Sequence, residues 1–233
     1  MLFVSSSILI ILYLFSIGVY SVYGDSSSPS MFLKGSVPYG IPYEDWVERW
    51  WNWNIQIPSE QHPSVYHPKL TDCVVGESES VSFLTPNLNG KSQYSCTIPA
   101  KNAILVPIST GHCPTFEAKS NALEDMIKCA TEGDKYLWSR VSIDDVPLLT
   151  MDPTAELDQK IYVKTKIFNV TIPENNFLNQ TAGQWKDAAG GYFIFLKPLP
   201  EGDHRLSISA RVTNPFDESF NYNYDTSYLL KVQ

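Results

Sequence analysis

The sequence predicts a mainly β protein, an antiparallel β-sandwich with a tryptophan-rich helix near its N-terminus and one further helix packed on it. Three observations support this prediction. Eight or nine segments alternate apolar and polar residues, as strands with one buried face do. Two other segments repeat their apolar residues with the helical period of about 3.6 residues. The strands do not alternate with helices, so a doubly wound parallel sheet is not expected.

The first helical segment runs from Tyr43 to Ile57 and contains four of the six tryptophans of the chain. Its main apolar stripe recurs at positions i, i+4, i+7 and i+11, at Trp46, Trp50, Trp53 and Ile57. Pro42 suits the start of a helix and Pro58 stops it. Because so much aromatic surface is costly to leave in water, we expect this helix to lie on the face of a sheet.

The remaining elements follow a loop that contains two His-Pro dipeptides. A second amphipathic helix is expected over residues 117–131. Strands are expected at 80–85, 92–98, 103–108, 136–143, 146–149, 160–172, 191–197, 204–212 and 227–232. This pattern is typical of a jelly-roll or immunoglobulin-like sandwich, and residues 38–233 are expected to form a single domain.

The N-terminus predicts export from the cytoplasm. Residues 1–24 contain an apolar run, Ile8 to Tyr20, of the length found in signal peptides, and cleavage after Gly24 fits the small residues there. No Lys or Arg precedes Lys34, so an uncleaved membrane anchor is the alternative. Residues 25–37 are then a flexible tether. Both readings place the domain outside the cytoplasm, secreted or on the outer face of the cell membrane.

Four cysteines and two glycosylation sequons agree with export. An even number of cysteines in an oxidising compartment predicts two disulfides among Cys73, Cys96, Cys113 and Cys129. Three connectivities are open, and we favour Cys73–Cys96 with Cys113–Cys129 because each closes a short loop. A metal site built from Cys and His is the rival interpretation. The sequons predict glycosylation at Asn169 and Asn179.

Composition and motifs narrow the function classes. The 233-residue chain carries a net charge of −8 and has no basic run, which argues against nucleic acid as a partner. It has no G-x-S-x-G, H-E-x-x-H, Walker or EF-hand motif. We therefore lean towards a protein that is not an enzyme, a secreted or cell-envelope binding module for a glycan or another surface partner. No cofactor is evident from these motifs.

The candidate ligand-binding residues are Trp50, Trp51 and Trp53, because aromatic faces stack on sugar rings. Their regular spacing favours core packing over a sugar platform, and Trp51 is the one expected to stay partly exposed.

The alternative function is a copper or zinc protein, or a metal-dependent enzyme. It requires His62, His67 and His112 to converge on one ion after the disulfides fold their loops together. Histidines that hydrogen-bond to the backbone in proline-flanked loops are the simpler interpretation.

An ordered series of short motifs spans residues 38–212. The series is Tyr43-x-x-Trp46, Trp50-Trp51-x-Trp53, His62-Pro63, Cys73, Val81-x-Phe83-Leu84, Cys96-x-Ile98-Pro99-Ala100, Ala103-Ile104-Leu105-x-Pro107, Gly190-Gly191-Tyr192 and Leu196-x-Pro198-Leu199-Pro200-x-Gly202-x-His204. It resembles a group of uncharacterised secreted microbial proteins with a W-rich opening helix and a late PL-x-x-G-x-H hairpin. The resemblance implies a secreted single domain and supplies no activity.

Overall fold

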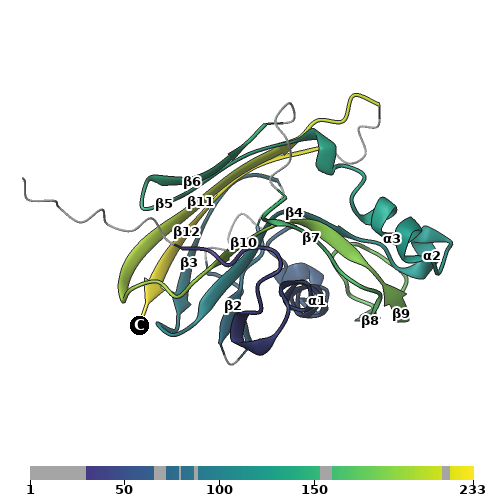
Figure 1. Ribbon diagram of the computed structural model, residues 1–233, viewed down its shortest axis with the longest axis horizontal. Helices are drawn as coiled ribbons and strands as arrows, with labels where there is room; N and C mark the ends of the chain where they lie inside the picture. Colours follow the sequence, from purple (N-terminus) through teal and green to yellow (C-terminus); the bar gives the residue numbers. More distant parts are fainter. Residues whose placement is uncertain (1–29, 66–71, 79, 87–88, 153–158, 217–220) are drawn as a thin grey trace, which may run out of the picture.

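A computed structural model describes residues 30–65, 72–78, 80–86, 89–152, 159–216 and 221–233 (Figure 1). The predicted signal peptide or anchor, residues 1–24, lies outside the described residues, as does the first part of the predicted tether. Within the described residues, every helix is too short or too polar to cross a bilayer.

Most of the described chain forms two sheets. The central sheet has the order β1-β2-β4-β10-β7, made of β1 (Gly76–Ser78), β2 (Val81–Phe83), β4 (Ala103–His112), β10 (Ala189–Leu196) and β7 (Tyr162–Lys164). The outer sheet has the order β3-β12-β11-β5-β6, made of β3 (Asn89–Ile98), β12 (Tyr222–Val232), β11 (Gly202–Val212), β5 (Leu137–Ile143) and β6 (Val146–Met151). β8 (Phe168–Ile172) and β9 (Gly183–Asp187) form a separate hairpin.

The predicted mainly β fold is confirmed, but the strictly antiparallel pairing is wrong. β3 pairs with β12 in parallel, and β2 pairs with β4 in parallel. β3 and β4 are consecutive strands, yet they lie in different sheets, so the turn between them joins the sheets instead of closing a hairpin. Alternation along a strand identifies its buried face, but it does not identify the partner strand.

One hydrophobic cluster takes its side chains from both sheets, and a second lies on the other face of the central sheet. β10 is buried along its whole length because it contributes to both clusters. Tyr192, Ile194 and Leu196 belong to the first cluster, and Phe193 and Phe195 belong to the second. This is why β10 is a continuous apolar run instead of an alternating one.

The helix α1 (Tyr43–Asn54) covers the second cluster, on the side of the central sheet away from the outer sheet (Figure 1). Its indoles are anchored by hydrogen bonds as well as by packing. Trp46 Nε1 donates to the Pro38 carbonyl at 3.0 Å, and Trp50 Nε1 donates to the Leu84 carbonyl at 2.8 Å. Trp51 Nε1 donates to the Thr110 hydroxyl at 3.2 Å. Because each buried N–H has an acceptor, these indoles add apolar area without an unsatisfied donor.

The predicted second helix, residues 117–131, is two helices in the structure, α2 (Thr115–Ala118) and α3 (Leu123–Ala130). Lys119 has a left-handed backbone, φ 51°, which ends α2. The Ser120 hydroxyl then accepts a hydrogen bond from the Ala122 N–H at 3.1 Å. A local side-chain bond of this kind competes with the backbone hydrogen bonds of a helix, which explains the break between α2 and α3. The spacing of the apolar residues continues across this break, so the sequence predicts a single helix. Three short 3-10 turns complete the element set, at η1 (Pro38–Gly40), η2 (Ser59–Gln61) and η3 (Asp134–Tyr136).

Two disulfides join segments close in sequence, Cys73 to Cys96 and Cys113 to Cys129, as the favoured pairing predicts. The second ties α3 to the end of β4. Gly190 and Gly191 lie on β10 opposite this end of β4. Gly191 has φ +140°, and a Cβ there would lie 2.2 Å from the Ser109 carbonyl oxygen. The Gly-Gly-Tyr motif is therefore required by the close approach of the two strands.

Candidate functional site

A small pocket opens where β2 leaves β4. The two strands pair only over Ala103–Leu105 on the β4 side, and within the described residues no strand continues along that edge. The cavity there has a volume of about 90 Å³. We call it the tryptophan pocket, and its lining is Trp50, Trp51, Asn54, Ser64, Thr85, Pro86, Pro107, Ile108, Ser109, Thr110, Phe177, Leu178 and Tyr222.

The walls of the tryptophan pocket are mainly apolar and aromatic. Trp50 and Trp51 come from α1, and their rings meet edge to face at 5.1 Å. Phe177 and Leu178 come from the connection between β8 and β9, and Tyr222 comes from the start of β12. Pockets with this character, an apolar lining and a few convergent polar groups, are the usual form of a binding site.

The inner end of the pocket is polar. The Ser109 hydroxyl donates to Asp134 Oδ1 at 3.4 Å, and Asp134 is only 6% exposed. Burial raises the pKa of Asp134 to about 7, although the hydroxyls of Tyr162 and Ser109 and the charge of Lys164 oppose the rise. Neither Asp134 Oδ2 nor the Tyr222 hydroxyl makes a well-formed hydrogen bond to the described residues. Ser109 and Tyr222 therefore give this part of the lining its polar character, and Asp134 lies behind Ser109, outside the lining.

His62 supports one wall of the pocket. Its Nε2 lies 3.2 Å from Asn54 Oδ1, and its Nδ1 accepts the Ser64 N–H at 3.1 Å. Its ring stacks on Phe177 at 3.5 Å. Both ring nitrogens are engaged in this structure, so His62 fixes Asn54 and Phe177 in place.

His112 lies on the other side of Trp51 and stacks on that indole at 4.3 Å. Its Nδ1 lies 2.5 Å from Asp187 Oδ2, and Asp187 Oδ1 accepts the Cys113 N–H at 3.1 Å. The Asp187 carboxyl orients the imidazole through Nδ1, and Nε2 is buried with no hydrogen-bond partner among the described residues. This pair fixes the position of Trp51 from behind.

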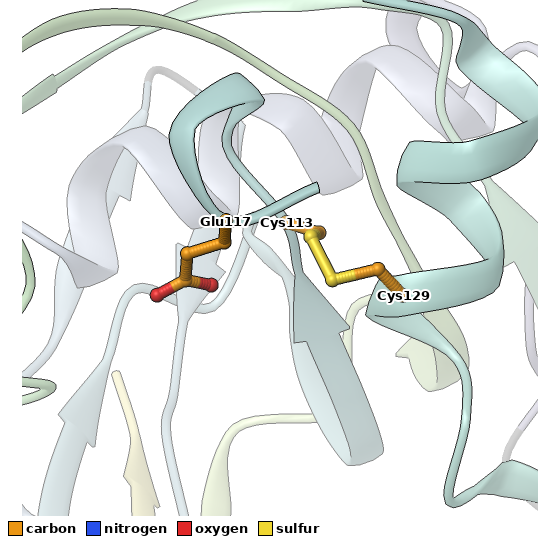
Figure 2. Close-up of side chains that lie close together, drawn as sticks. All are labelled: Cys113, Glu117 and Cys129. Atoms are coloured by element: carbon orange, nitrogen blue, oxygen red, sulfur yellow. A yellow bond between two sulfur atoms is a disulfide. The ribbon is translucent and has the colours of Figure 1, made fainter. Parts of the chain in front are cut away.

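The structure does not bring His62, His112 and a third histidine together in its described part, and His67 lies outside that part. The one group of three potential ligands found among the described residues is Cys113, Glu117 and Cys129. Figure 2 shows that its two cysteines form the disulfide, so their sulfurs are not thiolates. The copper or zinc hypothesis therefore stays a prediction that depends on His67.

The three candidate tryptophans do not form an exposed platform. Trp50 is 2% and Trp51 is 4% exposed, so the expectation that Trp51 stays partly exposed is wrong. Trp53 lies away from the pocket and packs against Phe83, with ring centroids 5.8 Å apart. The helix buries Trp46, Trp50 and Trp51 because the central sheet covers one flank of its apolar stripe and the β8–β9 connection covers the other.

The two sequons lie at exposed positions. Asn169 points away from the core on β8, and Asn179 follows the pocket residues Phe177 and Leu178 in a left-handed turn, φ 54°. Glycosylation at either asparagine stays a prediction.

The late PL-x-x-G-x-H segment joins β10 to β11, which lie in different sheets, so the expected hairpin is wrong, but the segment has a structural role. His204 Nδ1 lies 2.7 Å from Asp144 Oδ2, and Asp144 Oδ1 accepts the Arg205 N–H at 2.8 Å. Burial alone would raise the pKa of Asp144, but the bonds from His204 and Arg205 lower it. Asp144 and Asp145 both have positive φ, in the tight turn between β5 and β6. The motif histidine thus clamps the β5–β6 turn to β11, beside an open hollow of about 700 Å³ on the surface.

No family model matches the sequence, and no curated protein matches it. Three solved structures are similar at low levels. PbICP-C in complex with falcipain-2 has 11% identity over 65% of this chain and 98% of that chain, with a TM-score of 0.26. The cysteine protease inhibitor EhICP2 from Entamoeba histolytica has 10% identity over 68% and 100%, with a TM-score of 0.24. Amebosin has 9% identity over 67% and 100%, with a TM-score of 0.23. Likeness at this level carries no argument about the function of this chain.

Proposed function

We propose that this protein is an exported, non-catalytic binding module that receives one apolar side chain of a polypeptide partner in the tryptophan pocket. The observation that carries the proposal is the pocket itself, a preformed hollow with two indole walls and a polar inner end.

The size of the pocket favours a side chain over a sugar ring. Its volume of about 90 Å³ corresponds to about three water molecules. Sites for whole small-molecule ligands enclose about 300–1,000 Å³. The indole faces of Trp50 and Trp51 are also buried, so they offer no flat surface on which a sugar could stack. A branched aliphatic group of about four carbons matches the space and the lining.

Several features support the wider description. Two disulfides, two exposed sequons and the apolar N-terminal run support export to an oxidising compartment. A hydrophobic cluster shared by the two sheets supports the inference of a β-sandwich with α1 as a third layer. The parallel pairs β2–β4 and β3–β12 favour neither a pure jelly-roll nor a pure immunoglobulin-like order.

A titration with N-acetyl-leucinamide tests the proposal. We expect binding in the millimolar range, because burying one isobutyl group contributes about 2–3 kcal/mol. N-acetyl-serinamide should bind at least about thirtyfold more weakly, since it lacks that group. Intrinsic tryptophan fluorescence and amide chemical shifts are suitable readouts, because Trp50 and Trp51 line the pocket.

Two exposed leucines provide a matched pair of variants. Leu178 lies at the pocket and is 39% exposed, and Leu123 lies on α3 and is 40% exposed. Leu178→Asp should abolish the response to N-acetyl-leucinamide, whereas Leu123→Asp should leave it unchanged. Equal responses to the two amides, or equal effects of the two variants, would rule out the pocket as the site.

A further inference from the structure

The outward face of the outer sheet is not covered by α1, α2 or α3, which lie on the other side of the molecule or at its end (Figure 1). On this face, the large aromatic side chain of Trp138 is surrounded by polar side chains of the neighbouring strands. Trp138 on β5 is partly exposed and lies directly across from Arg211 on β11. Its buried neighbours on the strand, Leu137 and Ser139, point into the core instead.

Two guanidinium groups lie over the indole of Trp138. Arg211 Cζ is 5.5 Å and Arg140 Cζ is 6.0 Å from the ring centroid. Arg140 is two residues along β5 from Trp138, and both arginines are exposed. A cation held over an aromatic face loses side-chain freedom, while its N–H groups at the edge stay available to an acceptor. The indole of Trp138 thus provides an aromatic surface that orients the guanidinium groups of Arg140 and Arg211.

A groove of about 440 Å³ runs beside this group, lined by Tyr136, Trp138, Asp152, Arg211 and Thr213. Its volume falls within the range of ligand sites. The next positions along the ladders are also hydrogen-bonding groups. Asn223 lies opposite Arg211, and Ser209 lies opposite Arg140. The lining itself combines aromatic surface, a hydroxyl, one carboxylate and the Arg211 guanidinium, and the groups of Asn223, Ser209 and Arg140 lie beside it on the sheet.

The local charge differs from that of the whole protein. The chain carries a net charge of −8, yet Arg140, Arg211 and the ladder residue Lys91 are gathered on this face. Among the described residues, the acidic groups on the same face include Asp152, Asp225 and, at the far end of β11, Asp203. An acidic chain that gathers cations around one tryptophan is better matched to an anion than to a cation or to a second copy of itself.

We propose that this groove binds an acidic glycan, a polysaccharide that bears carboxylate or sulfate groups on its sugar rings. The guanidinium forks match such groups bidentately. The hydroxyl and amide groups of Thr213, Ser209 and Asn223 suit sugar hydroxyls, and the exposed edges of Trp138 and Tyr136 suit the apolar face of a sugar ring. This site is separate from the tryptophan pocket and does not depend on it.

Binding of polygalacturonate and dextran sulfate, with neutral dextran as the comparison, tests the inference. We expect both polyanions to bind the full exported domain and dextran to bind at least about tenfold more weakly, with affinity falling as salt rises. Binding by one polyanion alone identifies the acidic group, carboxylate or sulfate, that the site accepts.

The matched variants are Arg211→Gln and Arg49→Gln. Arg49 also lies over an indole, that of Trp46, at 5.0 Å, but it is on α1. The two variants remove the same charge and the same kind of contact. Arg211→Gln should weaken polyanion binding about tenfold, and Arg49→Gln should leave it unchanged. No polyanion binding, or an equal loss in both variants, would overturn the proposal, since the second result indicates attraction to the whole surface only.

Discussion

Replacing Trp50 with alanine is expected to lower the free energy of unfolding by about 4–5 kcal/mol. Deleting a buried tryptophan side chain costs about 3–5 kcal/mol. The variant also leaves the Leu84 carbonyl without the indole N–H that it accepts at 2.8 Å, which adds to the cost. Because domains of this kind are stable by only about 5–15 kcal/mol, this single change brings the protein close to unfolding.

Trp53→Ala is the control for this prediction. Trp53 lies on the same helix and is only partly buried, and its ring packs beside Phe83 and Gly76. Its loss should cost about 1–2 kcal/mol. Urea unfolding followed by circular dichroism measures both values. If the two variants lose the same stability, Trp50 does not have the central position in the core that the structure gives it.

Asp134→Asn is expected to stabilise the protein at pH 8 by roughly 2–4 kcal/mol and to have little effect at pH 4. Burial raises the pKa of Asp134 in the folded state to about 7, from about 3.8. The folded state therefore binds a proton more tightly than the unfolded chain. The Asp134 carboxyl therefore contributes its full stabilisation of the folded state below about pH 4. This contribution is lost as pH rises from about 4 to about 7.

The groups that face the Asp134 carboxyl are Ser109, Tyr162, Tyr222 and Lys164. An asparagine fills the same space without the charge, so the difference between variant and native protein isolates the ionisation. Asp145→Asn, in the exposed turn between β5 and β6, removes one charge elsewhere and should change stability little at either pH. Thermal unfolding across pH 4–8 gives the comparison. A stability difference that is constant over this range would contradict a buried, neutral Asp134.

Local patterns in the sequence predict several elements of the fold well. The apolar stripe locates α1, and alternation locates β5 and β11. The predicted strand at residues 160–172 is two strands in the structure, β7 and β8, which belong to different sheets. The sequence does not predict β9, because the polar segment before Ala188 shows no apolar alternation. Strand partners and breaks of this kind depend on tertiary contacts that no local pattern contains.

The sequence predicts some residues of the candidate site but not the pocket that they form. Trp50 and Trp51 were identified from their aromatic character, and His62 from its loop, but their pocket exists because β2 leaves β4 early. Asp134 lies in η3, just before β5, and Tyr222 is the first residue of β12, so the two are far apart in the sequence. Neither belongs to a recognisable motif. A buried carboxyl with a raised pKa is a property of the fold, so it had no sequence signal to find.

The most direct test of the tryptophan pocket is a crystal structure of the protein under xenon pressure. Xenon occupies preformed apolar cavities without requiring a specific chemical group. We expect xenon density between Trp50, Trp51 and Tyr222, with Trp50 still hydrogen-bonded to the Leu84 carbonyl. A structure in which the indoles have collapsed into this space, so that xenon binds elsewhere or not at all, would contradict it.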